Sequence, residues 1–127
     1  MRYPAAPPRA AARAMNLSTT SEIDDLERIA ATATAPVEPR QLCRIAIGGE
    51  EIPVHAFLIG NPDPAVPAIG FFGGVHGLER IGSDVVIAYL QSVIGRLRWD
   101  TTLHAQLERL RMVFMPIVNP GGMARRT

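Results

Sequence analysis

Two residues with the types and spacing for metal chemistry, His76 and Glu79, lie in the glycine-rich string 73–79, GGVHGLE. A spacing of three residues at the start of a helix lets an imidazole and a carboxylate converge on one point. These groups are two of the three protein ligands of a hydrolytic zinc ion, which keeps its fourth position open. The alternative is that Glu79 only caps a helix, where acidic residues are favoured, and that His76 is an ordinary loop histidine.

Two continuous apolar runs, Ala68–Phe72 and Met112–Val118, predict buried parallel strands on either side of the string and its helix. Two parallel strands that are connected by helices form a crossover unit. The carboxyl ends of parallel strands share one edge of the sheet, where α/β proteins bind their ligands. We therefore expect His76, Glu79 and Asn119, which follow these two runs, to lie at one edge.

The crossover is predicted to contain two helices. Apolar residues recur at intervals of three and four from Leu78 to about Leu97, at Ile81, Val85, Ala88-Tyr89, Ser92-Val93 and Leu97. A second helix begins near Asp100 or Thr101, either of which is a good N-cap.

The first part of the chain predicts a helix and a hairpin. The helix begins at Thr20 or Ser21 and ends near Ala33. The strands Gln41–Ile47 and Ile52–Ile59 flank Gly48-Gly49, in a turn that we expect to be longer than two residues. The predicted fold class is α/β, with a partial mixed sheet made of this hairpin and the two parallel strands. The predicted domains are a disordered tail (1–19), a helix and linker (20–39) and an α/β domain (40–127).

Composition excludes several classes of protein. The 127 residues contain 13 basic residues, all arginine, and 12 acidic residues, which gives a net charge of +1. This balance does not suit a strongly basic nucleic-acid binder, and no apolar run reaches the length of a membrane span. The single cysteine, Cys43, is expected to be a small buried hydrophobe, and it gives no reason to expect a secreted, disulfide-bonded protein. We therefore expect a cytoplasmic location.

Other catalytic patterns are weaker. The glycine loop does not continue into the G-K-[ST] of a phosphate-binding loop. A His-Gly oxyanion loop of an α/β-hydrolase is an alternative, but Gly82-Ser83-Asp84 only approaches the G-x-S-x-G pattern. His55, expected in the middle of a strand, and His104, expected on a helix beside Glu108, are assigned structural or solvated roles.

The string 73–79 resembles the first zinc-ligand motif of the zinc carboxypeptidase family (carboxypeptidase A-like), and it is also similar to the aspartoacylase and succinylglutamate desuccinylase branch. Residues 116–122, PIVNPGG, resemble the family's next element, a strand that closes on Asn-Pro-x-Gly. The resemblance covers residues 40–124. It implies that His76 and Glu79 bind zinc, that Asn119–Gly122 is a structural turn beside the site, and that this chain is the first half of the family's mixed sheet.

The chain also departs from the family pattern. In the family, a second zinc histidine, the glutamate that acts as general base and the substrate-binding arginines lie downstream of the Asn-Pro-x-Gly turn, and this sequence ends before them. Leu78 stands where the digestive carboxypeptidases have arginine. The resemblance thus implies a zinc-dependent hydrolase of peptides or N-acyl amino acids. We expect this chain to be a truncated portion that binds zinc weakly or not at all, has no catalytic residue and is inactive, with Met15 as an alternative start. The alternative is a non-catalytic partial domain that acts through protein association at an unpaired edge strand.

Overall fold

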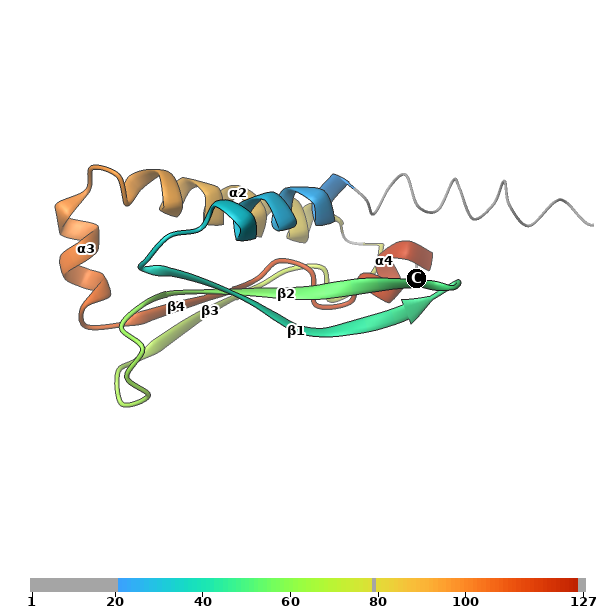
Figure 1. Ribbon diagram of the computed structural model, residues 1–127, viewed down its shortest axis with the longest axis horizontal. Coiled ribbons are helices and arrows are strands. Elements are labelled where there is room, and N and C mark those ends of the chain that lie inside the picture. Colours follow the sequence, from blue (N-terminus) through green and yellow to red (C-terminus); the bar gives the residue numbers. More distant parts are fainter. Residues whose placement is uncertain (1–20, 79, 126–127) are drawn as a thin grey trace, which may run out of the picture.

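The computed structural model describes residues 21–78 and 80–125, and helices cover one face of a four-stranded sheet (Figure 1). The strand order is β1-β2-β4-β3, in which β1 pairs with β2 and β2 with β4 antiparallel, while β3 and β4 are parallel. The mixed α/β fold class is therefore confirmed. The labelled elements are β1 (Val37–Ile47), β2 (Glu50–Gly60), β3 (Ala68–Phe72), α2 (Arg80–Arg96), α3 (Thr101–Leu107), β4 (Arg111–Met115) and α4 (Pro120–Arg125).

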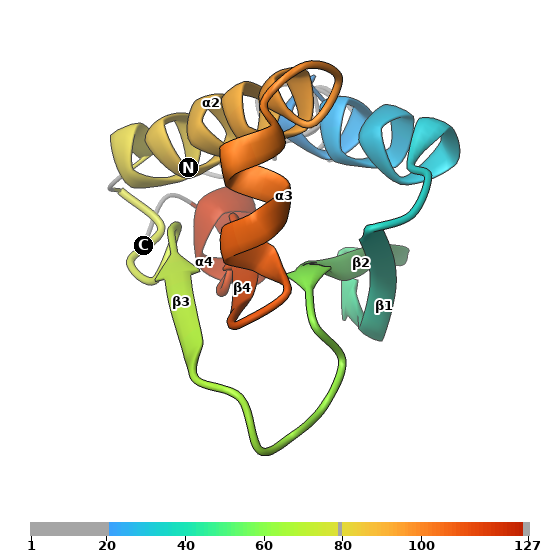
Figure 2. The same cartoon turned by 90° about the vertical axis from the view of Figure 1, so that its left-hand side faces the viewer.

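A further helix, here called the N-terminal helix, spans residues 21–32 and lies beside α2 over the same face of the sheet (Figure 2). Leu26 of this helix is 2% exposed and belongs to the same core as β2, β4 and α2. The predicted tail of residues 1–19 lies outside the described residues. Within the described part of the chain, we find no helix long and apolar enough to span a bilayer.

The hairpin of β1 and β2 closes through a turn of two residues. Ile47 pairs with Glu50, and Gly48 and Gly49 between them have φ values of 58° and 83°. Positive φ at both central residues is typical of a type I′ turn, whose twist matches that of the strands. The prediction of a longer turn is therefore wrong, because both strands continue up to the two glycines.

Cys43 is exposed, so its predicted burial is wrong. It lies on β1, an outer strand of the sheet, just after a shift in register between Gln41 and Cys43. Most residues of β1 beyond Val37 are solvent-exposed. An alternating pattern identifies the strand, but it does not say whether anything covers the strand's apolar face.

The predicted helix is present as α2, but only part of its apolar pattern is buried. Val86, Ile87, Leu90 and Val93 point into the core, whereas Ile81 and Val85 are 75% and 60% exposed. The core residues of α2 belong to the same hydrophobic core as Phe57 and Phe114 of the sheet, both fully buried. The helix is apolar on both faces, so periodicity alone could not decide which face is covered.

The second crossover helix begins as predicted. The Oδ1 atom of Asp100 accepts a hydrogen bond of 3.0 Å from the backbone N–H of Leu103, which makes Asp100 the N-cap of α3. Arg96 donates two hydrogen bonds to Oδ2 of the same carboxylate, at 3.0 and 2.6 Å. These hydrogen bonds, first that from Arg96 and then that from Leu103, lower the pKa of Asp100. The end of α2 is thereby joined to the start of α3.

His55 on β2 is a buried histidine whose Nε2 has no hydrogen-bond partner among the described residues. Burial lowers its pKa from the usual 6.5; nearby Arg44 lowers it further, and Glu27 of the N-terminal helix opposes the shift. The folded state thus binds the proton less readily than the unfolded chain does. Neutral His55 therefore contributes its full stability at pH values above its pKa in the unfolded chain. This contribution is lost as the pH falls through its lower pKa in the folded chain.

We therefore expect the free energy of unfolding to fall between pH 7 and pH 5 more steeply in the wild type than in His55→Phe. Phenylalanine also fills the site with an aromatic ring, but it cannot bind a proton. Urea unfolding at several pH values measures this difference. Parallel pH profiles of the two proteins would show that His55 does not contribute.

Candidate metal centre

The candidate site lies where β3 and β4 end side by side. These parallel strands pair from Ala68 with Arg111 to Phe72 with Met115. Beyond the strands, the Gly73 N–H donates to the Met115 carbonyl at 3.0 Å. The N–H groups of Val118 and Asn119 donate in turn to the carbonyls of Gly73 and Gly74, both at 2.9 Å. The two loops that follow the strands are therefore joined by backbone hydrogen bonds.

Strand β4 ends at Met115, three residues earlier than predicted. The next residue, Pro116, has no N–H and cannot donate to the ladder. Pro116 and Ile117 are buried against the loop after β3, although they are not part of the strand. Their burial explains why the apolar run is longer than the strand.

Gly73 and Gly74 occupy positions with no space for a side chain. A Cβ atom on Gly73 would lie 2.6 Å from the Gly82 carbonyl oxygen and 2.7 Å from that of Pro116. A Cβ atom on Gly74 would lie 2.5 Å from the Ser83 hydroxyl, and Gly74 also has a φ of +61°. The first turn of α2 therefore packs directly on the backbone of the loop, which sets where the loop leaves the sheet.

His76 lies in this loop, three residues after Gly73, and its side chain is exposed. The loop is held at the preceding residue, because Asn119 Nδ2 donates to the Val75 carbonyl at 3.3 Å. The structure thus brings the loop of His76 and the residue Asn119 to the same edge of the sheet, as the sequence predicts. The flanking Val75 and Leu78 are 49% and 72% exposed, so His76 stands in an apolar stretch of surface.

Glu79, the other predicted ligand, lies outside the described residues, in the chain position just before α2 begins at Arg80. Its assignment stays a prediction, as does that of His76. Among the described residues, no group of three or more His, Cys, Asp and Glu side chains is placed to hold a metal. The donor types of His76 and Glu79 suit zinc, and together they amount to two of its usual three protein ligands.

The other two histidines lie elsewhere in the fold. His55 is buried on β2, and His104 lies on α3 with its Nε2 2.7 Å from the Leu97 carbonyl oxygen. That nitrogen carries the proton, because a carbonyl oxygen can only accept. Both positions agree with the structural or solvated roles expected for them.

Asn119 has a sharper role than the structural turn implied by the family pattern. Its Oδ1 accepts a hydrogen bond of 2.8 Å from the Gly122 N–H, so Asn119 caps the short helix α4, which starts with Pro120. The sequence analysis missed α4. The signal was present, because asparagine is a preferred N-cap and proline is favoured at the first helical position.

An ion pair between Glu22 and Arg80 also supports the site and was not predicted. Glu22 lies in the N-terminal helix, is 7% exposed, and contacts the first residue of α2. The partners are 58 residues apart in the sequence, so no local pattern could have identified the pair. It connects the N-terminal helix to the point where the candidate ligand loop enters α2.

We expect Gly73→Ala to lower the free energy of unfolding by about 3 kcal/mol, because the new methyl group meets two backbone oxygens that cannot move aside. Gly95→Ala is the matched control. A Cβ atom at Gly95 meets nothing within 4 Å, so alanine there should stabilise α2 by about 0.5–1 kcal/mol. Urea unfolding measures both changes, and a Gly73→Ala variant as stable as the control would contradict the packing argument.

Comparison with known proteins agrees with the motifs. The sequence model of the zinc carboxypeptidase family matches residues 32–127. Carboxypeptidase D of Anas platyrhynchos is 27% identical over 86 residues, which cover 68% of this chain and 6% of that protein. The chain thus spans a small part of the length of this relative.

Proposed function

The chain belongs to the zinc carboxypeptidase family, and on that premise we propose that it forms the N-terminal part of a zinc-dependent peptide or amide hydrolase domain. His76 and Glu79 are the zinc ligands that it contributes. The observation that carries the proposal is the position of the His76 loop, which is hydrogen-bonded to Asn119 at the carboxyl ends of two parallel strands. The family membership expected from the two motifs is confirmed.

The contribution of each residue follows from its chemistry. A zinc ion, when bound, supplies a Lewis acid that polarises the substrate carbonyl. His76 offers an imidazole nitrogen, a usual zinc ligand, and its exposed position leaves the residue accessible. Asn119 holds the loop at Val75 and is a positioning residue. The exposed Leu78 has no positive charge, so it cannot form an ion pair with the carboxylate of a substrate.

We further propose that these 127 residues, taken alone, are inactive. Their three histidines include His55 and His104, which lie away from the loop of His76. A zinc ion held by two protein ligands is bound more weakly than one held by three. Peptides and N-acyl amino acids are then substrates of a complete site. The cytoplasmic location remains a prediction.

Titration of the purified chain with zinc, followed by calorimetry, should give weak binding at one site that is lost in the His76→Ala, Glu79→Ala double variant. His104→Ala is the matched control, because it removes an exposed histidine outside the loop and should leave zinc binding unchanged. Equal binding by the wild type and the double variant would overturn the assignment of the ligands.

Zinc-loaded wild-type chain should also show no hydrolysis of an N-acylated dipeptide above that of the double variant. Hydrolysis that depends on His76 would contradict the proposed inactivity while supporting the assignment of His76.

The alternative function, protein association, is favoured by a separate observation. In the part of the chain that the structure describes, strand β3 pairs on one side only, and its residues Ile69 and Phe72 are 47% and 58% exposed. The exposed Ile81 and Val85 of α2 lie on one stripe of the helix that packs beside it. We propose a second copy of this chain as the occupant. Antiparallel pairing of two β3 strands would extend the sheet and bring both α2 helices together on one face.

Ile69→Lys should abolish this association, because a charge on an edge strand opposes strand pairing. Leu42→Lys is the matched control on the other edge strand, where Leu42 is 54% exposed. Sedimentation velocity over a range of concentrations measures the oligomeric state. A wild-type chain that remains monomeric throughout would exclude self-association.

A further inference from the structure

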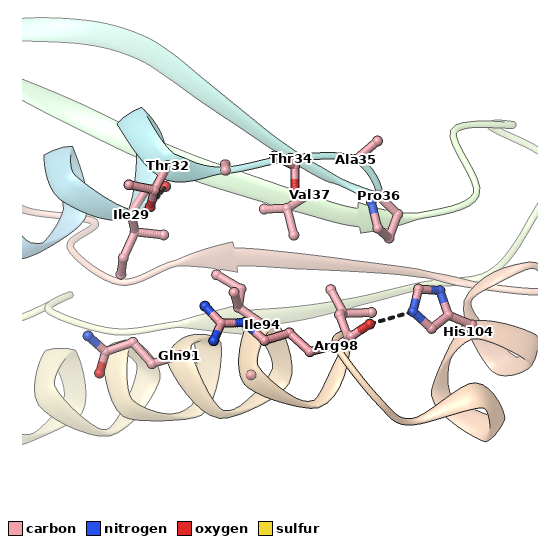
Figure 3. A pocket seen from close by; sticks show the side chains of 13 residues that line it. Ile29, Thr32, Thr34, Ala35, Pro36, Val37, Gln91, Ile94, Arg98 and His104 are labelled. Atoms are coloured by element: carbon pink, nitrogen blue, oxygen red, sulfur yellow. Dashed lines mark hydrogen bonds between the residues drawn. The ribbon is translucent and has the colours of Figure 1, made fainter.

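A cavity of about 560 Å³ lies at the other end of α2 from the candidate metal centre. Its walls are the end of the N-terminal helix and the linker to β1 on one side, and the last turns of α2 with His104 of α3 on the other (Figure 3). Its volume is within the range of about 300–1,000 Å³ that small-molecule sites occupy. It is separate from the His76 loop, which precedes the first turn of α2.

The floor of the cavity is apolar. Ile29 and Ala33 come from the N-terminal helix and its end, and Ile94 and Leu97 come from α2 and the turn after it. All four are partly buried side chains packed against the core. An apolar body resting on them would be removed from water without disturbing the core.

Arg98 also lines the cavity, and none of the ion pairs between described residues includes it. In Figure 3 the Arg98 side chain runs back along α2 toward Gln91, which also lines the cavity. No acidic residue is among those that line the cavity within the described part of the chain. The acid nearest to Arg98 in sequence, Asp100, is already bonded to Arg96 and to the Leu103 N–H. Arg98 is therefore available to an anion.

Gly95 opens the cavity in the wall formed by α2. Glycine inside a helix costs about 0.5–1 kcal/mol relative to alanine, and here neither a positive φ nor a close contact requires it, because a Cβ atom would meet nothing within 4 Å. Its missing side chain leaves space next to Ile94 and Arg98. This position also provides a way to fill the cavity without altering the core.

None of the other polar side chains that the structure describes along the cavity carries a negative charge that would repel a bound carboxylate. The Thr32 hydroxyl is hydrogen-bonded to the Arg28 carbonyl at 2.9 Å, and His104 donates its Nε2 proton to Leu97. Neither places a negative charge in the cavity. We propose that this cavity binds a small carboxylate with an aliphatic tail, whose carboxylate pairs with Arg98 and whose tail covers Ile94 and Ile29.

Octanoate is the probe, followed by amide chemical shifts of the ¹⁵N-labelled full chain. We expect saturable shifts at Gly95, Arg98 and Ala33, with affinity reduced about tenfold in Arg98→Met, which loses the charge-assisted hydrogen bond but keeps a long apolar side chain. Octanol should bind the wild type and Arg98→Met equally weakly. Arg109→Met, which removes an exposed arginine outside the cavity, should bind octanoate as the wild type does.

Gly95→Leu should abolish octanoate binding by filling the cavity, while far-ultraviolet circular dichroism and thermal unfolding show an intact fold. His76→Ala should bind octanoate normally, so the result is independent of the proposed zinc ligands. Equal affinity in the wild type, Arg98→Met and Gly95→Leu, or the absence of saturable shifts in the wild type, would overturn the proposal.

Discussion

The arrangement of the candidate site depends on the direct backbone contact between the loop after β3 and the first turn of α2. Gly73 and Gly74 allow this contact because each has no side chain at a point where a Cβ atom would meet Gly82, Pro116 or Ser83. The same two residues accept backbone hydrogen bonds from Val118 and Asn119. One pair of glycines therefore fixes α2, the loop of His76 and the end of β4 relative to one another. A side chain at either position would separate all three.

The N-terminal helix contributes to this arrangement from a distance. Its Leu26 completes the core under α2, and its Glu22 pairs with Arg80 at the residue where the candidate loop becomes helix. The family match begins at residue 32, at the end of this helix. The helix thus supports the site from a part of the chain that the match does not cover.

The sequence predicted most of the fold because strong local signals were present. Continuous apolar runs identified β3 and β4, the double glycine marked the hairpin, and Asp100 marked the start of α3. The errors concern what covers each surface. Cys43 is exposed on an edge strand, and in α2 the helical pattern did not show that Val86 and Leu90 are buried while Ile81 and Val85 are exposed. Local periodicity cannot settle such choices, because they depend on partners distant in the sequence.

For the site, the sequence identified the loop of His76 and its neighbour Asn119, and the structure places them together. The cap that Asn119 forms on α4 was missed, although asparagine followed by proline is a local signal for it. The pairing of Glu22 with Arg80 could not be predicted, because the two residues are 58 apart in the sequence.

Helix α4 also gives the candidate loop a chemical sensitivity. Met123 is 2% exposed, and its sulfur accepts a hydrogen bond of 3.5 Å from the buried Ser83 hydroxyl, next to Gly74. Oxidation to the sulfoxide would add a polar oxygen where Gly74 leaves no space even for a methyl group. Because Met123 is buried, its oxidation requires that the packing around α4 loosens. The sulfoxide oxygen would then hinder the return of Ser83 and Gly74 to their contacts with this side chain.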